Sequence, residues 1–371
     1  MKFSANQQVL VKALNIVSKA VTARTTIPIL KGILLRINEN GILTMAASDL
    51  EINIEKKLKV EDSEPGEIVV QAKLFGDIIR KLPNSTVNIS EQNGNVLIHC
   101  AGSEFNIIGS ESDEFPKIGE EQQPSEKIIF DKQTLTDMIK RTSFAASIDE
   151  SRGVLTGILI EMTETNLNMV ALDGFRMAVA RENIKNSQAQ NIIISAKILN
   201  EIGKIVSETE TNQENVDLYI NNNMATFELE DTKVVLRILE GEFVRYQDIL
   251  PKDSNTRIVV NKNDLLDSIE RASLLAKVGK NNLIRLELTE NNMEITSKSE
   301  EGNVKEDVII SKEGNDLVIG FNSKYLIDAL KVIDEEQITM LFNTSISPCL
   351  IRPVTGEGFE YLILPVRITG N

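Results

Sequence analysis

The chain carries the same sequence pattern three times. In each copy a short apolar strand leads into a helix with a lysine at its start, and the copies are IVVQAKLFGDIIRKL (68–82), IIISAKILNEIGKIV (192–206) and LVIGFNSKYLIDALKVI (317–333). Lys73, Lys197 and Lys324 hold corresponding positions, at separations of 124 and 127 residues. Such separations are as long as a whole domain and far exceed the repeats of solenoids and propellers. The sequence therefore predicts three similar domains in series.

The region before each of these segments repeats as well. Each copy is typical of a strand, a polar turn and an amphipathic helix, at residues 3–21, 130–145 and 260–276. Alternating apolar and polar residues follow, interrupted by Asn or Gly as in GILLRINENGILTMAAS, which indicates β-hairpins. We predict an α+β fold of three β-rich domains, each made of two β-α-β-β-β halves. The predicted boundaries are 1–125, 126–253 and 254–371.

Length and composition limit the class of protein. A chain of 371 residues can form two or three domains, each with its own core. The two cysteines, Cys100 and Cys349, lie in apolar strand-like stretches, so we expect buried, reduced thiols rather than a disulfide or a metal site. The sequence has no signal-like start and no run of eighteen apolar residues. We expect a soluble, cytoplasmic protein without a membrane partner.

Little in the sequence supports catalysis. The single histidine, His99, lies in a strand-like stretch without a neighbouring nucleophile or metal-ligand pattern. The common phosphate-binding, dinucleotide-binding and zinc-binding motifs do not occur in the sequence. We expect no catalytic residue, no metal and no cofactor. A hydrolase or transferase on repeated β-rich domains is a minor alternative, which would need a convergent polar site that the sequence does not reveal.

Charge is distributed unevenly along the chain. The net charge of −15 by itself argues against a nucleic-acid partner. However, the predicted helices hold 15 of the 40 Lys and Arg residues and only 7 of the 55 Asp and Glu residues, at residues 7–20, 73–82, 132–145, 197–206, 262–277 and 324–333. If these helices share one face, that face attracts duplex DNA through its phosphates without reading sequence. The alternative is that Lys and Arg occur there only as good helix formers.

Five segments carry a resemblance to a known family. They are MKFSANQQVLVKALNIVSKAV, ARTTIPILKGILLRI, AASDLEINI, ALDGFRMAVAR and YLILPVRI, and they occur in the order and spacing of that family. The chain resembles the bacterial DNA polymerase III β subunit, the sliding clamp family, over its whole length. The resemblance implies a head-to-tail homodimer whose six domains close a ring, with helices lining the hole around sequence-independent duplex DNA. It also implies a processivity factor for replication without catalytic activity of its own.

The resemblance implies a site for partner proteins. In the family a short peptide enters a pocket between the second and third domains, and the matching residues here are Leu155, Leu172, Gly174, Phe175, Arg176, Met177, Phe243, Val244, Ile249, Ser347, Leu362, Ile363, Leu364, Pro365, Val366 and Arg367. The implied partners are the replicative polymerase catalytic subunit, the clamp loader, and repair or translesion proteins with a clamp-binding peptide. An apolar cleft suits such a shared site, since micromolar binding needs only about 8 kcal/mol.

The resemblance and the charge pattern suggest DNA and dimer contacts. Arg24 and Lys73 match basic positions that contact the duplex in the family. Candidates by charge on the predicted helices are Lys12, Arg80, Lys140, Arg141, Lys197, Lys204, Lys277 and Lys331. Each is weak alone, because a lone exposed lysine often serves only solubility. For the dimer junction we expect the edge strand 103–109 with Phe105 and Ile107, and the family's helical hydrophobic pair maps to Leu274 and Leu275, which are equally expected as domain core.

Three departures from the family pattern affect the expected sites. Leu172 and Phe175 stand where many relatives have Thr and His, which would make the pocket floor more apolar. Val244 and Arg245 replace a usual Pro-Asp, and ESRGVL (150–155) lacks the paired tyrosines that some relatives carry near DNA. These departures leave peptide preference and one DNA contact open. A further alternative is a monomeric peptide-binding scaffold that encircles nothing, which predicts a monomeric mass.

Overall fold

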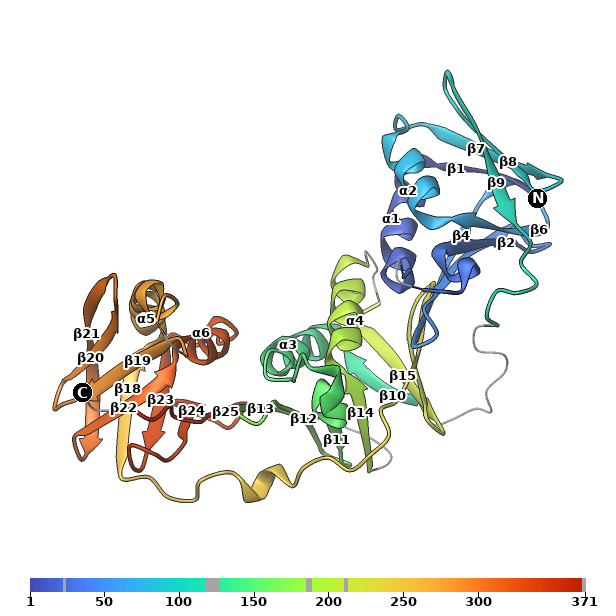
Figure 1. The fold of residues 1–371 in the computed structure, drawn as a ribbon. Helices are drawn as coiled ribbons and strands as arrows, with labels where there is room; N and C mark the ends of the chain where they lie inside the picture. The colour runs from blue at the N-terminus through green and yellow to red at the C-terminus, as the bar shows by residue number, and fades with distance from the viewer. Residues whose placement is uncertain (23–24, 118–126, 185–188, 210–212, 280, 369–371) are drawn as a thin grey trace. The chain divides into compact units, whose positions relative to one another are not determined.

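The computed structural model of the protein describes residues 1–22, 25–117, 127–184, 189–209, 213–279 and 281–368 (Figure 1). The chain forms two compact units. Unit 1 contains Met1–Lys132 and Lys204–Ile238, and unit 2 contains Gln133–Gly203 and Leu239–Asn371. The predicted boundary between residues 125 and 126 lies outside the described residues, and the boundary between 253 and 254 stays a prediction.

The helices and strands form six β-α-β-β-β motifs, two in each of three domains, which confirms the predicted fold class. The helices are α1 (Gln7–Val17), α2 (Ala72–Lys81), α3 (Lys132–Ser143), α4 (Ala196–Glu208), α5 (Lys262–Ala276) and α6 (Ser323–Lys331). Domain 1 has β1 (Lys2–Asn6), β2 (Gly32–Ile37), β3 (Ile42–Ser48), β4 (Ile52–Lys59), β5 (Glu61–Glu64), β6 (Gly66–Gln71), β7 (Thr86–Gln92), β8 (Asn95–Cys100) and β9 (Ser103–Ser110). Domain 2 has β10 (Lys127–Asp131), β11 (Gly157–Met162), β12 (Asn166–Leu172), β13 (Arg176–Asn183), β14 (Gln190–Ser195), β15 (Asn215–Asn221), β16 (Met224–Leu229) and β17 (Thr232–Arg237). Domain 3 has β18 (Thr256–Asn261), β19 (Leu283–Leu288), β20 (Asn292–Ser299), β21 (Gly302–Gly314), β22 (Leu317–Asn322), β23 (Gln337–Phe342), β24 (Cys349–Pro353) and β25 (Phe359–Ile363).

An amide side chain at the end of the preceding strand begins four of the helices. The side chains of Asn6, Gln71, Asn261 and Asn322 accept hydrogen bonds from backbone N–H groups in the first turns of α1, α2, α5 and α6. The first N–H groups of a helix have no partner within it, and a capping side chain contributes about 1 kcal/mol. Because the cap stands at the same place in these four motifs, the repeated sequence determines where strand changes to helix in them.

The strands of unit 1 form one antiparallel sheet in the order β10-β15-β16-β17-β4-β3-β2-β6-β9-β8-β7-β1-β5. β17 of domain 2 pairs with β4 of domain 1, with Val234 opposite Ile54, so the sheet continues from one domain into the next. Helices α1 and α2 lie side by side on this sheet (Figure 1). Leu10, Leu14 and Phe75 from these helices expose none of their surface, which places the core between helices and strands.

Unit 2 has the same construction. Its strands form an antiparallel sheet in the order β14-β11-β12-β13-β25-β24-β23-β18-β21-β20-β19-β22. β13 of domain 2 pairs with β25 of domain 3, with Ala178 opposite Tyr361. Helices α5 and α6 lie side by side, and α5 packs on β19, β20 and β21 (Figure 1). Leu265, Ile269 and Leu326 are fully buried in this core.

Two observations bear on the expected chemistry of the chain. Cys100 and Cys349 are free and buried, as predicted, and burial raises the pKa of the Cys349 thiol. A buried thiol with a raised pKa is unreactive, because the thiolate is the nucleophile. In the part of the chain that the structure describes, no helix is both long and apolar enough to cross a membrane.

Candidate functional site

Six apolar side chains lie on one side of the sheet in unit 2, and we call them the domain 2 face: Leu159, Val170, Leu172, Met177, Val179 and Ile193. Backbone pairing sets Ile193, Leu159, Val170 and Val179 in one row across β14, β11, β12 and β13. Leu172 and Met177 form the next pair on the same side of the sheet, two residues after Val170 on β12 and two residues before Val179 on β13. Each of the six exposes at most 7% of its surface, so the face is a continuous apolar floor.

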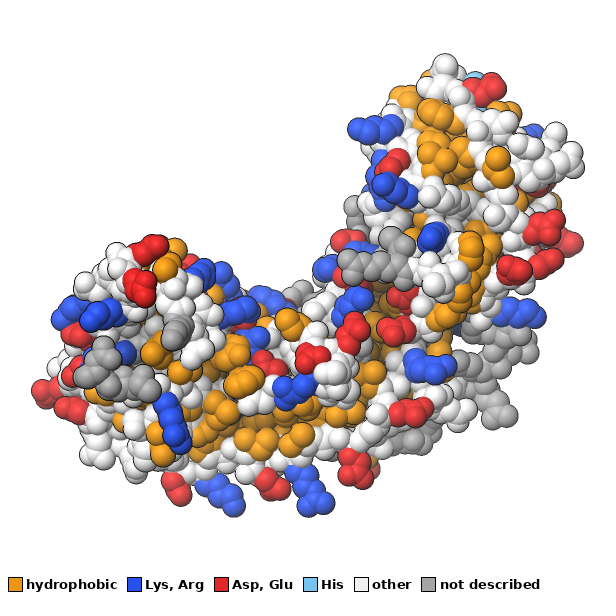
Figure 2. Space-filling view, in the orientation of Figure 1, with side chains coloured by type: hydrophobic (Ala, Val, Ile, Leu, Met, Phe, Trp, Pro, Cys, Tyr) orange, Lys and Arg blue, Asp and Glu red, His pale blue; other side chains and the backbone are white. Residues whose placement is uncertain are grey.

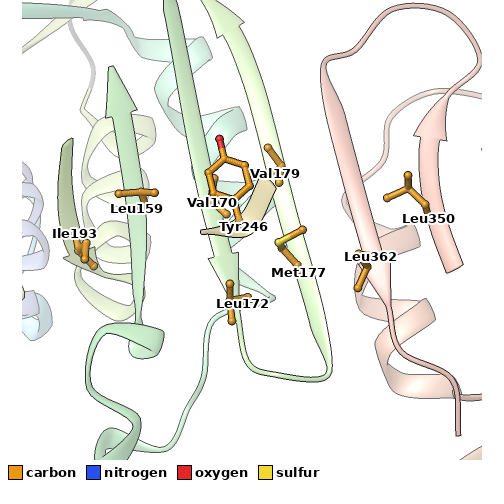
Figure 3. Packing of buried hydrophobic residues seen from close by; sticks show 9 residues of the cluster. All are labelled: Leu159, Val170, Leu172, Met177, Val179, Ile193, Tyr246, Leu350 and Leu362. Carbon is orange, nitrogen blue, oxygen red and sulfur yellow. The ribbon is translucent and has the colours of Figure 1, made fainter. Parts of the chain in front are cut away.

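The segment between domains 2 and 3 crosses this face. Tyr246 lies over β12 and β13 beside Val170 and Val179 (Figure 3), and 3% of its surface is exposed. Its hydroxyl donates a hydrogen bond to Glu161 Oε2 at 2.8 Å. Burial and this hydrogen bond raise the pKa of Tyr246, so the ring stays neutral at physiological pH. Tyr246 anchors the segment, and we did not predict it as a site residue.

Several residues predicted to bind a peptide surround the domain 2 face. Leu155 and Phe243 are partly buried against it, and Leu362 on β25 belongs to the same cluster. A rim of exposed apolar side chains borders the floor, with exposed fractions of 54% for Phe175, 42% for Val244, 40% for Ile249 and 36% for Leu364. In Figure 2 hydrophobic side chains form a band in this part of unit 2. A buried floor with an exposed apolar rim can receive apolar side chains of a ligand.

The remaining predicted pocket residues have other surroundings. Ile363 is 1% exposed and points away from Leu362, because neighbouring residues of a strand face opposite sides of the sheet. Val366 donates its backbone N–H to the carbonyl of Gly320 at 2.8 Å, so the chain after β25 follows β22. Pro365 is half-buried and Arg367 is exposed, and the hydroxyl of Ser347 is bonded to that of Thr344 at 2.7 Å. These residues border the site without forming its floor.

Arg176 is held by a buried polar network at the edge of the face. Its Nε donates to Asp173 Oδ2 at 3.0 Å, and its Nη1 donates to Asp328 Oδ2 at 2.6 Å. The guanidinium carbon lies 4.7 Å from the ring centre of Tyr325 and 5.5 Å from that of Phe144. Ion pairs and stacking of this kind fix the orientation of arginine. Since only 9% of Arg176 is exposed, its contacts are largely with the protein itself.

Phe175 forms the most exposed part of the rim. Its ring is stacked on Tyr325, with centroids 6.1 Å apart and an interplanar angle of 21°. Its carbonyl accepts a hydrogen bond from Leu364 N at 2.9 Å, which ties the loop after β12 to the chain after β25. Gly174 has φ +89°, a conformation that favours glycine. We did not predict Tyr325 or Asp328, because both lie on α6 and no local sequence signal links that helix to this loop.

Comparisons with known proteins place the chain in a family. It matches the models of the DNA polymerase III beta subunit for the N-terminal domain at residues 1–119, the central domain at 130–244 and the C-terminal domain at 247–367. The beta sliding clamp of Bacillus subtilis is 36% identical over 381 aligned residues, which cover 99% of this chain and 100% of the relative. The chain belongs to the sliding clamp family.

Solved sliding clamp structures share the fold. The DNA polymerase sliding clamp of Bacillus subtilis is 35% identical, with a TM-score of 0.93 and 100% of both chains covered. A putative DNA polymerase III beta subunit from Eubacterium rectale is 38% identical, with a TM-score of 0.92 and 99% of both chains covered. These comparisons confirm the family resemblance and the three-domain clamp fold expected from the sequence.

The described cations that we predicted to contact DNA lie on or beside the helices. Arg24 is outside the described residues. Side chains with exposed surface are those of Lys12, Lys73, Arg80, Lys140, Lys197, Lys204, Lys277 and Lys331, whereas Arg141 is half-buried. Several have acidic partners: Lys140 pairs with Asp334 at 3.2 Å, and Lys331 with Glu270 at 2.8 Å. These pairs lower the net positive charge around the helices.

In the part of the chain that the structure describes, two strands have an unpaired edge over part of their length. β9 pairs with β8 over residues 103–108 and with β6 only through Gly109 and Ser110. β21 pairs with β20 over residues 302–309 and with β18 only from Ile310 onward. Among the described residues, no strand pairs with the second edge of residues 103–108 or 302–309. Unpaired N–H and C=O groups on such edges can pair with another chain.

The residues that we predicted at the dimer junction differ in exposure. Phe105 on β9 is 39% exposed and Leu274 on α5 is 66% exposed, so both can contact another chain. Leu275 is half-buried. Ile107 is only 8% exposed and belongs to the core of domain 1, whereas its neighbour Ile108, which we did not predict, is 84% exposed. Alternation along β9 explains the difference, since consecutive side chains face opposite sides.

Proposed function

We propose that two copies of this chain close a ring around duplex DNA and tether polymerase and other partners through the domain 2 face. The observation that carries the proposal is a pattern of strand pairing between domains. It occurs twice within the chain, and a third pair of corresponding strands lacks a partner among the described residues. The last strand of the first motif in one domain pairs with the last strand of the second motif in the next domain, as β4 does with β17 and β13 with β25. By the same rule, β21 of domain 3 pairs with β9 in domain 1 of a second copy. Two identical junctions of this kind close a dimer.

The rule also specifies the register of the proposed junction. Within unit 1, Val234 on β17 faces Ile54 on β4. The corresponding positions of the repeat are Phe105 on β9 and Val304 on β21, which places two apolar side chains opposite each other. The next pair in this register is Glu104 with Lys305, which have opposite charges. Apolar and opposite-charge pairs across an antiparallel ladder each contribute about 0.2–1 kcal/mol.

A similar charged pair occurs where the rule is already satisfied inside the chain. At the equivalent place between β4 and β17, Glu55 lies opposite Lys233. The charge of Lys233 opposes the effect of burial on the pKa of Glu55, which is nevertheless raised. The charges are exchanged between the two junctions. In the chain, glutamate is on β4 and lysine on β17. In the proposed junction, lysine is on β21, which corresponds to β4, and glutamate is on β9, which corresponds to β17. Opposite charges in both places favour the register and disfavour a slip by one residue.

In the proposed ring the helices contact DNA through many weak phosphate contacts. Lys73 and Lys197 stand at the starts of α2 and α4, and among the described residues neither has an ion pair within 4.0 Å. Cations that meet phosphates release counterions, so retention falls as salt rises. Neutralising Lys73, Lys197 and Lys277 together is expected to shorten retention on DNA gradually. A single substitution that abolished retention while dimer and partner binding persisted would contradict distributed contact.

The domain 2 face serves as the partner site in this proposal. Apolar anchors of a short peptide would lie on Leu172 and Met177, with Phe175, Val244 and Leu364 as the rim. Partners would be the replicative polymerase, the clamp loader, and repair or translesion proteins that carry such a peptide. The clamp itself would hold these enzymes on DNA in the cytoplasm and would catalyse no reaction.

The junction can be tested by a disulfide between copies. Opposed residues of an antiparallel pair have Cα atoms about 4.5–5.5 Å apart, which suits a disulfide. A chain with both Phe105→Cys and Val304→Cys is expected to form a covalent dimer under mild oxidation, visible on a non-reducing gel. The native thiols do not interfere, because Cys100 and Cys349 are buried. Chains with either substitution alone serve as controls and should stay uncrosslinked; equal crosslinking of a single variant would reject the register.

Ring closure is tested by mass and by topology. Light scattering should give twice the chain mass of 41.3 kDa. Clamps loaded on nicked circular DNA by a clamp loader should remain bound at moderate salt and run off after the circle is cut. A monomeric mass, or binding that is indifferent to DNA ends, would support the alternative of a monomeric peptide-binding scaffold.

A further inference from the structure

Domain 3 repeats the geometry of the domain 2 face with a different chemistry. Its corresponding row across β22, β19, β20 and β21 consists of Gly320, Arg285, Thr296 and Lys305, which are paired in register. Lys298 pairs with Asn303, as Leu172 pairs with Met177 in domain 2. We call these six residues the domain 3 face. Every apolar position of the domain 2 face is therefore polar, charged or glycine in domain 3.

The domain 3 face is hollow. A cavity of about 750 Å³ has Arg285, Thr296, Lys298, Asn303 and Lys305 among its lining residues, and its apolar sides come from the end of α5 and from the chain after β25. In domain 2 the same place is occupied by Tyr246. In domain 1 it is occupied by Phe115, which is 6% exposed. In domain 3 the chain after β25 covers Gly320 at one end of the row, and Ile368, which is 39% exposed, lines the cavity. Domain 3 therefore has an aliphatic side chain at the border of this place and no aromatic anchor in it among the described residues.

The cations of the face can exchange their present partners for a ligand. Arg285 donates to Glu287 at 2.6 Å, and Lys305 donates to Glu294 at 2.5 Å. Arg285 and Lys305 are 35% and 56% exposed, and ion pairs this exposed contribute only about 0–1 kcal/mol. Among the described residues, Lys298 has no acidic group within 4.0 Å. A carboxylate from outside can thus bind Lys298 and share Arg285 at small cost.

Two segments of the chain itself indicate what such a seat accepts. Residues 110–116 read SESDEFP. This segment crosses the corresponding face of the sheet in domain 1, where Phe115 packs against Leu34 and Val69. Residues 240–246 read EGEFVRY and place Tyr246 on the domain 2 face. Both segments carry carboxylates and reach an aromatic anchor. In the first, residues 112–115 form a turn in which Phe115 N donates to Ser112 O at 2.8 Å, and in the second, residues 242–245 are irregular. We infer that the domain 3 face binds an acidic segment of a partner protein, with an aromatic side chain in the cavity and carboxylates on Lys298 and Arg285.

The position of the face favours a protein segment over DNA. Ile284 and Leu286 alternate with Arg285 along β19 and are fully buried in the core under α5. Arg285 therefore lies on the side of the sheet opposite α5, the helix that ends next to the predicted DNA contact Lys277. A strand added beside β21 would extend the sheet edgewise and leave the face open, as β25 does beside β13. This site goes beyond the proposed function. Lys305 also belongs to the proposed dimer junction, but Lys298 and Arg285, which receive the carboxylates of the ligand, belong neither to that junction nor to the domain 2 face.

The test uses the full chain and the peptide SESDEFP with an N-terminal fluorophore. Fluorescence anisotropy should show saturable binding, and SKSKKFP and SESDEAP should bind at least tenfold more weakly. A chain with Lys298→Glu and Arg285→Gln is expected to bind SESDEFP about tenfold more weakly, since two exposed ion pairs are lost. Leu172→Ser is the matched variant in the domain 2 face and should leave this affinity unchanged.

Several outcomes would overturn the inference. They are equal affinity for the acidic and lysine peptides, loss of binding with Leu172→Ser instead of Lys298→Glu, and full displacement of the peptide by a short DNA duplex. Should the double variant fail to fold by circular dichroism, Thr296→Trp, which fills the cavity on an exposed side, gives the same test. Dimer mass and retention on circular DNA report on the proposed function separately, because the variants at Lys298, Arg285 and Thr296 leave Phe105, Val304 and Lys305 of the proposed junction unchanged.

Discussion

The faces of domains 1 and 2 have the same construction but different surfaces. In unit 1, Phe115 packs on a row that contains Val69, Leu34 and Ala46, and in unit 2 Tyr246 packs on the corresponding row of the domain 2 face. Beyond this shared anchor, the equivalent positions in domain 1 are Ser48, Asn53 and Glu55, where domain 2 has Leu172, Met177 and Val179.

The difference separates what the fold needs from what a ligand needs. An aromatic anchor on an apolar row covers the sheet and fixes the segment that leads to the next domain, so both domains retain it. The neighbouring positions lie beyond the anchor and contribute less to the fold, so their polarity can change. An apolar surface there suits a peptide pocket in domain 2, whereas polar side chains in domain 1 would leave such a peptide's apolar anchors without partners.

The largest expected effect comes from removing the anchors. Tyr246→Ala and Phe115→Ala each delete a buried ring, and loss of such a ring costs about 3–5 kcal/mol. Hydrogen exchange followed by mass spectrometry should show faster exchange in β11–β13 for Tyr246→Ala and in β2, β3 and β6 for Phe115→Ala. Each variant is the control for the other, because the two anchors lie in different units. Faster exchange of the same peptides in both variants would break the comparison.

Exchanging side chains between the faces should transfer their polarity without unfolding the chain. A variant with Leu172→Ser and Met177→Asn gives domain 2 the side chains of domain 1. If the domain 2 face is the partner site, affinity for a clamp-binding peptide should fall about 10- to 100-fold, since burial of one apolar side chain is worth about 1.5–3 kcal/mol. Isothermal titration calorimetry with the wild type and the variant measures the change.

The reverse exchange is the control for this prediction. Ser48→Leu with Asn53→Met should add no peptide binding, because domain 1 lacks the rim that Phe175 and Leu364 form in domain 2. Gain of a second peptide site would mean that two floor residues suffice and that the rim is dispensable. Unchanged affinity in the first variant would mean that the ligand does not contact Leu172 or Met177.

The stabilities of the segments that carry Phe115 and Tyr246 should also change at opposite ends of the pH scale. Hydrogen bonds from Ser112 and Arg36 lower the pKa of Glu67 below its ordinary 4.5, so their stabilisation is present above that value and is lost as pH falls through the folded pKa. The pKa of Tyr246 is raised above its ordinary 10.0, so the advantage of its neutral form is present below that value and is lost as pH rises beyond it.

Urea unfolding can check these signs. The midpoint difference between the wild type and Glu67→Gln is expected to shrink below about pH 4.5, and that between the wild type and Tyr246→Phe to shrink above about pH 10. At neutral pH, Tyr246→Phe should cost about 1 kcal/mol, the usual contribution of a hydrogen bond. Differences that do not change over the whole range would mean that neither group titrates differently when the chain unfolds.

Local features of the sequence were sufficient to predict the fold. The strand-to-helix joints with their caps at Asn6, Gln71 and Asn322, and the hairpins with Asn or Gly at their turns, depend on contacts between residues close in the chain. The six motifs followed from these joints and from the repeat. The resemblance added the family, two of the six floor residues of the proposed peptide site, Leu172 and Met177, and its rim.

Contacts between distant parts of the chain could not be predicted in this way. Arg176 meets Asp328, and Phe175 meets Tyr325, across two domains of unit 2, where no periodicity or motif links the loop to α6. Among the described residues, the second edge of 103–108 is unpaired, in agreement with the edge strand that the sequence predicts. Alternation along β9 places Ile107 in the core and Ile108 at the surface. The sequence of domain 3 also contained Arg285 and Lys298, whose common face becomes visible only when the strands are paired.

The smallest expected effect tests a turn that the two faces share. In domain 1, Asp49 Oδ1 accepts hydrogen bonds from the N–H groups of Glu51 and Ile52, and in domain 2 Asp173 Oδ1 accepts two in the same pattern. The residue after each aspartate has a positive φ, which is +89° for Gly174 and +76° for Leu50. A side chain in this conformation costs about 1–2 kcal/mol, and glycine loses about 0.5–1 kcal/mol of chain entropy on folding.

Leu50→Gly is therefore expected to stabilise domain 1 by about 0.5 kcal/mol, the difference between these two costs. Leu50→Ala is the matched control, since it removes the exposed side chain but keeps the Cβ, and it should leave the urea midpoint unchanged. Stabilisation by alanine as large as that by glycine would assign the effect to the exposed leucine side chain. Stabilisation by glycine alone would mean that domain 1 tolerates strain at the turn where domain 2, which must hold Phe175 in the rim of its face, has glycine.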